Sequence, residues 1–217
     1  MAGLPITRQQ EQVVDGVGRQ VQWFERVRLE LRPEQAPPHD VVVGRLGVER
    51  LEQQGRSWWA FLKGSAEVAA AASSSSSPSD CRFFPETEHT VCGNILATWR
   101  SYGLELDGQR GTSETESLAL FGLPLSEPQT ETLDNGQTYT VQWFERGRFE
   151  VAPDVSPPRV SLGLLGHEVL SHPAENPPPP PPQALPAPAT PGEESPADHP
   201  RLPETEWGEI PGVRARP

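Results

Sequence analysis

The chain has 217 residues and a formal net charge of −12, an acidic excess that argues against nucleic acid or an anionic membrane as its main partner. Its hydrophobic content is only 35% and it carries 26 prolines, so part of the chain is expected to lie outside any packed core. Residues 1–30 contain no apolar run of the signal-peptide type, and the longest apolar stretch, residues 68–72, is too short to cross a bilayer.

One hexapeptide occurs twice, as Val21-Gln-Trp-Phe-Glu-Arg26 and as Val141-Gln-Trp-Phe-Glu-Arg146. Neighbouring residues are repeated as well, because Gly3-Leu4-Pro5 returns as Gly122-Leu123-Pro124 at a similar offset. Shifts of one residue in that offset fall at polar or proline-rich points, where loops tolerate them. We therefore predict one small structural unit that is used twice. The first unit, residues 1–66, is expected to be incomplete, since the segment before Gly122 has no counterpart before Gly3.

In the first unit, residues 21–30 have the β-favouring composition of a strand, with a bend before Leu29. Residues 41–43 are predicted to form a short buried strand, and residues 46–54 a helix that ends at Gly55. The dense aromatic and aliphatic group that follows is expected in the core; it consists of Trp58, Trp59, Phe61 and Leu62.

An alanine- and serine-rich segment follows, and we assign residues 67–80 to a flexible linker. The second unit, residues 81–172, begins with a predicted helix that Thr87 or Thr90 caps and that ends near Tyr102, with Gly103 as its C-terminal glycine. Its apolar face would carry Val91, Ile95, Trp99 and Tyr102.

Ser113 and Glu116 have the spacing of a capping box for a second short helix, which Gly122 would end. The sequence Asp134-Asn135-Gly136 predicts a tight turn into a strand over residues 138–146. From residue 173 to residue 217 proline is so frequent that we predict a disordered tail. The expected fold is thus α+β: two related units, each a short antiparallel sheet with packed helices, followed by the tail.

The cysteines and the other polar residues of the second unit allow several kinds of chemistry. Cys81 and Cys92 could form a disulfide, remain two buried thiols, or bind a metal together with His89, although three ligands at this spacing match no standard zinc pattern. Glu86, Glu88 and His89 could suggest acid–base chemistry, and Ser113 or Ser126 a nucleophile. None of them lies in a motif that would activate it, so we expect no catalytic residue, no metal site and no cofactor.

The motifs of the second unit resemble the LGFP-type repeats of bacterial envelope proteins. They are still more similar to a family of secreted bacterial repeat proteins, through Cys-x-Phe-Phe-Pro-Glu-Thr-x-His-Thr at residues 81–90, the Leu-Ala-Leu-Phe-Gly-x-Pro-Leu-Ser-Glu-Pro motif at residues 118–128, and Gln-Trp-Phe-Glu-Arg at residues 142–146. The resemblance covers residues 81–170 well and residues 3–51 in part. It implies an extracellular or cell-envelope location, which favours the disulfide, and it implies attachment to cell-wall glycan.

On that basis we expect a non-enzymatic module that binds envelope glycan or acts as a surface adaptor. The alternatives are a protein-interaction scaffold with a polyproline spacer and, less favoured, a fragment or accessory part of an enzyme. The expected partners are cell-wall glycan or another envelope protein, without a transmembrane segment. Aromatic rings beside arginines would suit a sugar that carries carboxylates. The candidate binding residues are Trp143, Phe144, Arg146 and Arg148, together with Trp23, Arg26 and Arg28. The competing interpretation places Trp23 and Trp143 in the core and makes the arginines part of a cross-strand charge ladder that holds the turn.

Overall fold

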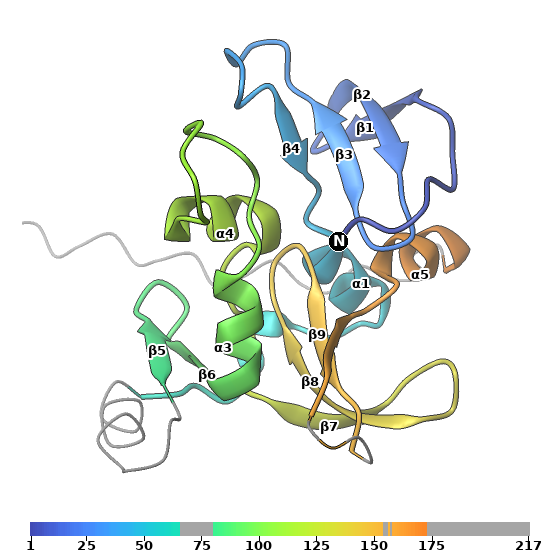
Figure 1. Cartoon of the computed structure of the whole chain (residues 1–217). Coiled ribbons are helices and arrows are strands. Elements are labelled where there is room, and N and C mark those ends of the chain that lie inside the picture. Colours follow the sequence, from blue (N-terminus) through green and yellow to red (C-terminus); the bar gives the residue numbers. More distant parts are fainter. Residues whose placement is uncertain (66–79, 154–155, 157, 173–217) are drawn as a thin grey trace, which may run out of the picture. The chain divides into compact units, whose positions relative to one another are not determined.

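The computed structural model describes residues 1–65, 80–153, 156 and 158–172, and these residues form helices and antiparallel sheets (Figure 1). The expected α+β class is therefore confirmed. The linker assigned to residues 67–80 falls outside the described residues except for Asp80, and the tail assigned to residues 173–217 falls outside them entirely. No described helix is both long and apolar enough to cross a membrane.

A four-stranded antiparallel sheet, one α-helix and the short 3-10 helix η1 Trp58–Ala60 make up the N-terminal half, residues 1–65. Its elements are β1 Gln10–Val14, β2 Val17–Trp23, β3 Arg28–Leu31, β4 Val41–Val43 and α1 Leu46–Gln53. Asp15 and Gly16 join β1 to β2 with φ values of 51° and 77°, the backbone that two-residue hairpin turns require. The strand predicted over residues 21–30 is in fact two strands, because residues 24–27 form a turn closed by the hydrogen bond from Phe24 N to Val27 O at 2.8 Å.

The C-terminal half, residues 122–172, has the same order of elements. They are β7 Gln129–Thr132, β8 Thr138–Trp143, β9 Arg148–Val151, β10 Val160–Leu162 and α5 Leu165–Ser171. The turn at Asp134, Asn135 and Gly136 joins β7 to β8 as predicted. Trp143 pairs with Arg148 across β8 and β9, as Trp23 pairs with Arg28 across β2 and β3.

Residues 80–121, here called the covering layer, lie between the two halves in sequence. They form β5 Cys81–Phe84, β6 His89–Cys92, α3 Gly93–Arg100 and α4 Glu114–Phe121. Cys81 and Cys92 are opposite each other on β5 and β6 and are joined by a disulfide. The cap prediction for α3 is wrong, because Thr87 and Thr90 belong to the β5–β6 hairpin and α3 begins only after Cys92.

The end of α3 also differs from the prediction. The helix stops at Arg100, before Gly103, and Tyr102 is 45% exposed although it was placed on the apolar face. The capping box of α4 is confirmed: Ser113 Oγ accepts a hydrogen bond from Glu116 N, and Ser113 N donates to Glu116 Oε2. Gly122 ends α4 with a φ of 74°, as expected for a C-terminal glycine.

The Glu116 carboxylate makes the stability of α4 depend on pH. Hydrogen bonds from the backbone N–H groups of Leu106 and Ser113 lower the pKa of this carboxyl below its ordinary value of 4.5. A carboxyl whose pKa is lowered in the folded state stabilises the fold above its unfolded pKa, and the stabilisation is lost as the pH falls through its folded pKa. We expect Glu116→Gln to lower the melting temperature at pH 7, and this difference to shrink in melts below about pH 4. Glu114→Gln, in the same turn but exposed, is the control, and a loss that stays the same at all pH values would contradict the prediction.

Two apolar cores result from this arrangement. The first joins both halves and contains Trp23, Trp143, Leu46 and Leu165. The second lies against the covering layer, and its rings are those of Phe84, Trp99, Phe121, Phe144 and Phe149. Trp58 and Phe61 only border the first core and Leu62 is 87% exposed, so the apolar group predicted as core lies at its margin.

Each half also caps the N-terminus of the helix in the other half. The backbone N–H groups of Gly47 and Val48, at the start of α1, donate to Glu145 O in the turn of the other half at 3.0 and 3.2 Å. In return, His167 N at the start of α5 donates to Glu25 O at 3.2 Å. Helices α1 and α5 lie next to each other (Figure 1). Each helix thus has some of its first free N–H groups satisfied by the opposite half.

Candidate functional site

The aromatic residues predicted to bind sugar are buried. Trp23 is 1% exposed, and Trp143 and Phe144 are 0% exposed. Trp143 and Phe144 face opposite sides of the sheet, as neighbours on a strand must, and each side is covered by a different core. No ring of these three residues is available for stacking on a ligand, so the structure supports the core interpretation of Trp23 and Trp143 over the sugar platform.

Arg28 and Arg148 are buried as well, and each holds two carboxylates. Arg148 Nη2 lies 2.7 Å from Glu150 Oε1 and 2.7 Å from Glu168 Oε1, and its guanidinium lies over the ring of Trp143 at 5.0 Å. Burial lowers the pKa of the Arg148 guanidinium, but hydrogen bonds and charge from Glu168 and Glu150 outweigh burial and leave this pKa raised. The arginine therefore braces β9 against α5 and is not free to grip a ligand.

Arg28 repeats this arrangement with Glu30 on its own strand and Glu49 on α1. The predicted charge ladder across the turn is thus replaced by a connection from strand to helix in each half.

Arg26 and Arg146 bind the edge strands of the sheets. Arg146 donates to Val43 O on β4, and Arg26 Nε donates to Leu162 O on β10 at 3.2 Å. Burial is the main reason why the pKa of Arg146 is lowered. The Arg26 side chain remains 33% exposed. Of the seven predicted binding residues, Arg26 lines the most spacious of the described hollows, Arg148 lines a second of about 380 Å³, and Arg28 and Arg146 line a third of about 100 Å³.

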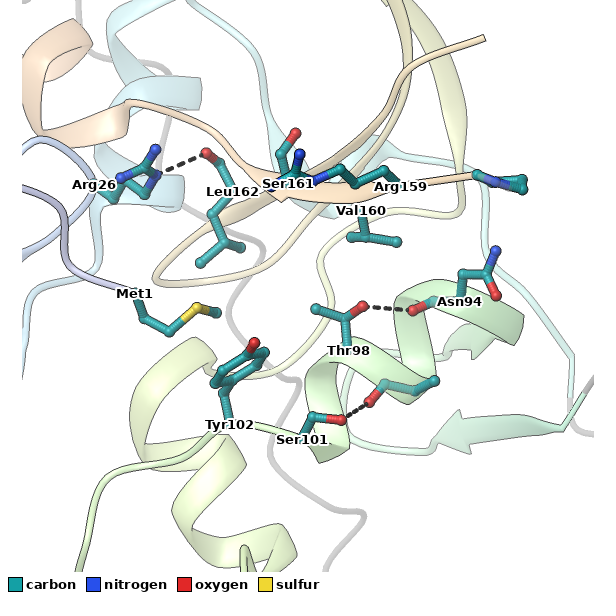
Figure 2. Close-up of a pocket in the computed structure, with 12 residues that line it drawn as sticks. Met1, Arg26, Asn94, Thr98, Ser101, Tyr102, Arg159, Val160, Ser161 and Leu162 are labelled. Carbon is teal, nitrogen blue, oxygen red and sulfur yellow. Dashed lines mark hydrogen bonds between the residues drawn. The ribbon is translucent and has the colours of Figure 1, made fainter. Parts of the chain in front are cut away.

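The hollow lined by Arg26 is a groove that lies between α3 and β10 and has a volume of about 630 Å³ (Figure 2). Figure 2 shows Val160 and Leu162 on one side, facing Thr98 and Tyr102 on the other. The remaining lining residues that bear on its chemistry are Met1, Arg26, Asn94, Ala97, Ser101 and Arg159. Two arginines and no acidic residue are among the described residues of the lining, although the whole chain carries a net charge of −12.

Strand β10 is an edge strand, because the sheet order is β10-β9-β8-β7. Gly163 N donates to Arg148 O, so by the alternation of antiparallel pairs the backbone groups of Val160 and Leu162 point away from β9 and toward the groove. Arg26 occupies the carbonyl of Leu162. On the helix side, the hydroxyls of Thr98 and Ser101 donate to carbonyls within α3 and leave their lone pairs for a ligand.

Three of the residues considered for catalysis, Ser113, Ser126 and His89, have structural partners. Ser126 Oγ accepts a hydrogen bond from Trp143 N at 3.0 Å, and His89 is fully buried with Nδ1 3.3 Å from Glu127 Oε1. His89 belongs to β6 itself and its side chain is buried, so it is not a solvent-facing acid or base. The disulfide uses both cysteine sulfurs, which removes Cys81 and Cys92 as metal ligands.

Among the described residues, an acidic cluster lies where the loop before α4 meets the first turn of that helix. Carboxylate oxygens of Glu105, Asp107 and Glu116 lie within 4.8 Å of one another. Those of Glu116 accept backbone hydrogen bonds from Leu106 and Ser113, so their position is explained by capping.

Sequence reasoning missed the groove for a physical reason. Asn94, Thr98 and Ser101 follow each other at helical spacing, which is the one signal of a polar helix face. That β10 and Arg26 lie opposite this face depends on how distant segments pack. Comparison with protein-family models, with curated proteins and with solved structures finds no match for this chain.

Proposed function

We propose that this protein is a non-catalytic surface adaptor, a module that holds a protein partner outside the cytoplasm. The observation that carries the proposal is the open groove between α3 and β10, which has basic residues and no described acidic ones in its lining. Sites for small substrates enclose most of their ligand, whereas an open groove beside an edge strand suits a segment of another protein.

We further propose that residues 3–51 and 122–170 are two copies of one unit. In support, the same contacts recur in both segments. Leu4 N donates to Glu25 Oε2 at 3.0 Å and Leu123 N donates to Glu145 Oε2 at 3.1 Å. The bridges from Pro5 to Phe24 and from Pro124 to Phe144 also correspond. In this view an adaptor arose by duplication, and the described residues contain one covering layer, which packs against both copies.

The location we propose is extracellular or in the cell envelope. The disulfide between Cys81 and Cys92 supports it, because disulfides persist mainly in oxidising compartments. The resemblance to secreted repeat proteins points the same way.

Binding of cell-wall glycan is the second candidate, and one observation favours it. Tyr102 is 45% exposed and lines the same groove as Arg26 and Arg159, and an aromatic ring beside cations suits a sugar with carboxylates. The burial of Trp23, Trp143 and Phe144 moves any such site to this groove.

The test separates a protein partner from a glycan. The full chain, with a photo-reactive amino acid in place of Ser101, is incubated with solubilised envelope proteins and, separately, with purified cell walls. We expect crosslinks to one envelope protein, reduced at least fivefold by Arg159→Glu. Arg8→Glu, an exposed arginine outside the groove, is the matched control and should leave the crosslinks unchanged.

If the chain is retained only on purified cell walls, and Arg159→Glu lowers that retention, the adaptor proposal is contradicted and glycan binding becomes the favoured function. The proposed function would be contradicted if wild type and Arg159→Glu gave crosslinks of equal strength. It would also be contradicted if the chain bound neither the envelope proteins nor the cell walls.

A further inference from the structure

We infer that the hollow of about 380 Å³ between β9, the β7–β8 turn and α5, here called the C-terminal hollow, binds a guanidinium cation. The hollow is separate from the groove between α3 and β10, so the inference goes beyond the proposed adaptor function. It comes from comparing this hollow with the N-terminal hollow, the one of about 100 Å³ that lies between β3 and α1.

Both hollows are built on the same kind of buried ion network. In each, a buried arginine on the third strand of its half holds one carboxylate from its own strand and one from the helix that follows the sheet. The two sets are Arg28 with Glu30 and Glu49, and Arg148 with Glu150 and Glu168. The two hollows can therefore be compared position by position.

In the N-terminal hollow a second arginine completes the pairing. Arg28 donates to Glu30 Oε1, and Arg32 Nη2 lies 3.3 Å from the other oxygen, Glu30 Oε2. Arg32 comes two residues after Glu30, and side chains at that spacing lie on the same face of an extended chain. Both oxygens of the buried Glu30 carboxylate are thus paired with a guanidinium.

The C-terminal hollow has no such second arginine, because the residue two positions after Glu150 is Ala152. Arg148 donates both of its hydrogen bonds on this strand to Glu150 Oε1, and no described residue pairs with Glu150 Oε2. The Glu150 side chain is only 12% exposed, and burial raises the pKa of its carboxyl in spite of Arg148. A cation beside the unpaired oxygen would therefore stabilise this buried carboxylate.

The C-terminal hollow also has the room for such a cation. Arg32 and Arg45 line the N-terminal hollow, whereas the matching residues of the repeated sequence are Ala152 and Leu164. The volume is about 380 Å³ instead of about 100 Å³, and small-ligand sites begin at roughly 300 Å³. The space that arginine side chains narrow in one half is thus open in the other.

The charges of the C-terminal hollow select a cation. Its ionisable lining residues are three carboxylates, one arginine and two histidines, namely Asp134, Glu150, Glu168, Arg148, His167 and His172. Arg50 also holds Asp134 and Glu168, which leaves Glu150 as the carboxylate with an unpaired oxygen.

A guanidinium suits this hollow better than a metal ion. Within the described part of the chain, three metal-type ligand atoms lie within 4.8 Å of one another only where the loop before α4 meets that helix. A guanidinium needs no such cage, because its planar fork of N–H donors matches a single carboxylate. It is also the group that Arg32 supplies to Glu30 in the other half.

The experiment titrates the full chain with two guanidinium compounds. N-acetyl-arginine methylamide represents an arginine side chain of a peptide, and agmatine represents a free small molecule. N-acetyl-lysine methylamide is the matched control ligand, since its ammonium lacks the planar fork. NMR shifts of residues 148–151 and 165–172 locate the site. The ionic strength is held constant, because a chain with a net charge of −12 attracts cations non-specifically.

We expect saturable binding of both guanidinium compounds, at least threefold tighter than that of the lysine compound. Glu150→Gln keeps the shape of the side chain without its charge and should weaken binding at least tenfold. Ala152→Arg should weaken it as much by placing an arginine where Arg32 stands in the other half, and it should raise the melting temperature. Ala152→Gln, of intermediate length and uncharged, is the control and should not raise it.

The two ligands also distinguish the source of the cation. Tighter binding of the arginine compound would assign the site to a peptide, and tighter binding of agmatine would assign it to a free small molecule. Equal affinity of the wild type, Glu150→Gln and Ala152→Arg would overturn the inference. So would NMR shifts confined to residues outside the hollow, or no saturation by about 10 mM ligand. The Ser101 crosslink that tests the adaptor function does not depend on this result.

Discussion

Gly47→Ala and Gly166→Ala are each expected to destabilise the protein by about 3 kcal/mol, near the upper end of what overpacking costs. A Cβ on Gly47 would lie 1.9 Å from Phe144 O, and a Cβ on Gly166 would lie 1.9 Å from Phe24 O. Both obstacles are backbone oxygens in turns, so they cannot rotate away as a side chain would. Helix propensity acts in the opposite direction, because alanine is better than glycine by at most about 1 kcal/mol.

The sign of the change in the free energy of unfolding therefore shows whether the steric clash or the higher helix propensity of alanine dominates. Urea denaturation gives the free energy of unfolding of each variant, and Gly147→Ala is the control because a Cβ there meets no atom within 4 Å. If Gly47→Ala and Gly166→Ala unfold at the same urea concentration as the control or at a higher one, the close contact between helix and turn does not exist in solution.

Arg148→Met is expected to cost a similar amount, about 3 kcal/mol at pH 7.5, because removing one partner from a buried ion network leaves charges without compensation. Arg148 is 3% exposed, and the carboxylates of Glu150 and Glu168 that it holds are 12% and 15% exposed. Methionine keeps much of the apolar contact with Trp143, so the loss reports mainly on charge.

This loss should depend on pH with a defined sign. Burial already raises the pKa of Glu150 against the opposing effect of Arg148, and removing Arg148 raises it further. A carboxyl with a raised pKa binds its proton more tightly in the folded state, so stability falls as the pH rises through the folded pKa. The deficit of Arg148→Met relative to the wild type should thus be largest at pH 7 to 8 and smaller near pH 5.

A conservative variant sharpens this result. Arg148→Lys keeps the charge but loses the planar fork that reaches both carboxylates, so an intermediate loss is expected. Denaturation series at each pH check all three proteins. A deficit that does not change between pH 5 and pH 8 would show that packing over Trp143, and not charge, accounts for the effect.

The sequence predicts well those elements that local chemistry decides. The capping box of Ser113 and Glu116 and the turn at Asn135 and Gly136 form as expected, because all their hydrogen-bonding partners lie within a few residues. The prediction that Thr90 caps a helix is wrong because the partner of Thr90 is far away in the sequence. Its backbone N–H donates to Glu127 at 2.7 Å, 37 residues away, and no local pattern contains that information.

The candidate site was less predictable than the fold for the same reason. Trp143 and Phe144 are adjacent and face opposite sides of the sheet, but what covers each side comes from elsewhere in the chain. Leu46 and Leu165 cover the tryptophan side, while Trp99 and Phe121 belong to the core on the phenylalanine side. The groove likewise needs Arg26 and Leu162, whose contact spans 136 residues.

The hydrogen bonds by which each half caps the other half's helix have a consequence for how the chain folds. The contact from Gly47 to Glu145 and the contact from Arg26 to Leu162 join residues about 100 positions apart or more. Neither half can complete its own helix start before the other half has formed its turn. Folding thus requires contacts between residues far apart in the sequence, and such contacts lower the folding rate. A nascent chain emerging from the ribosome could form the first sheet early, but α1 would gain its final partner only after residue 145 had been synthesised.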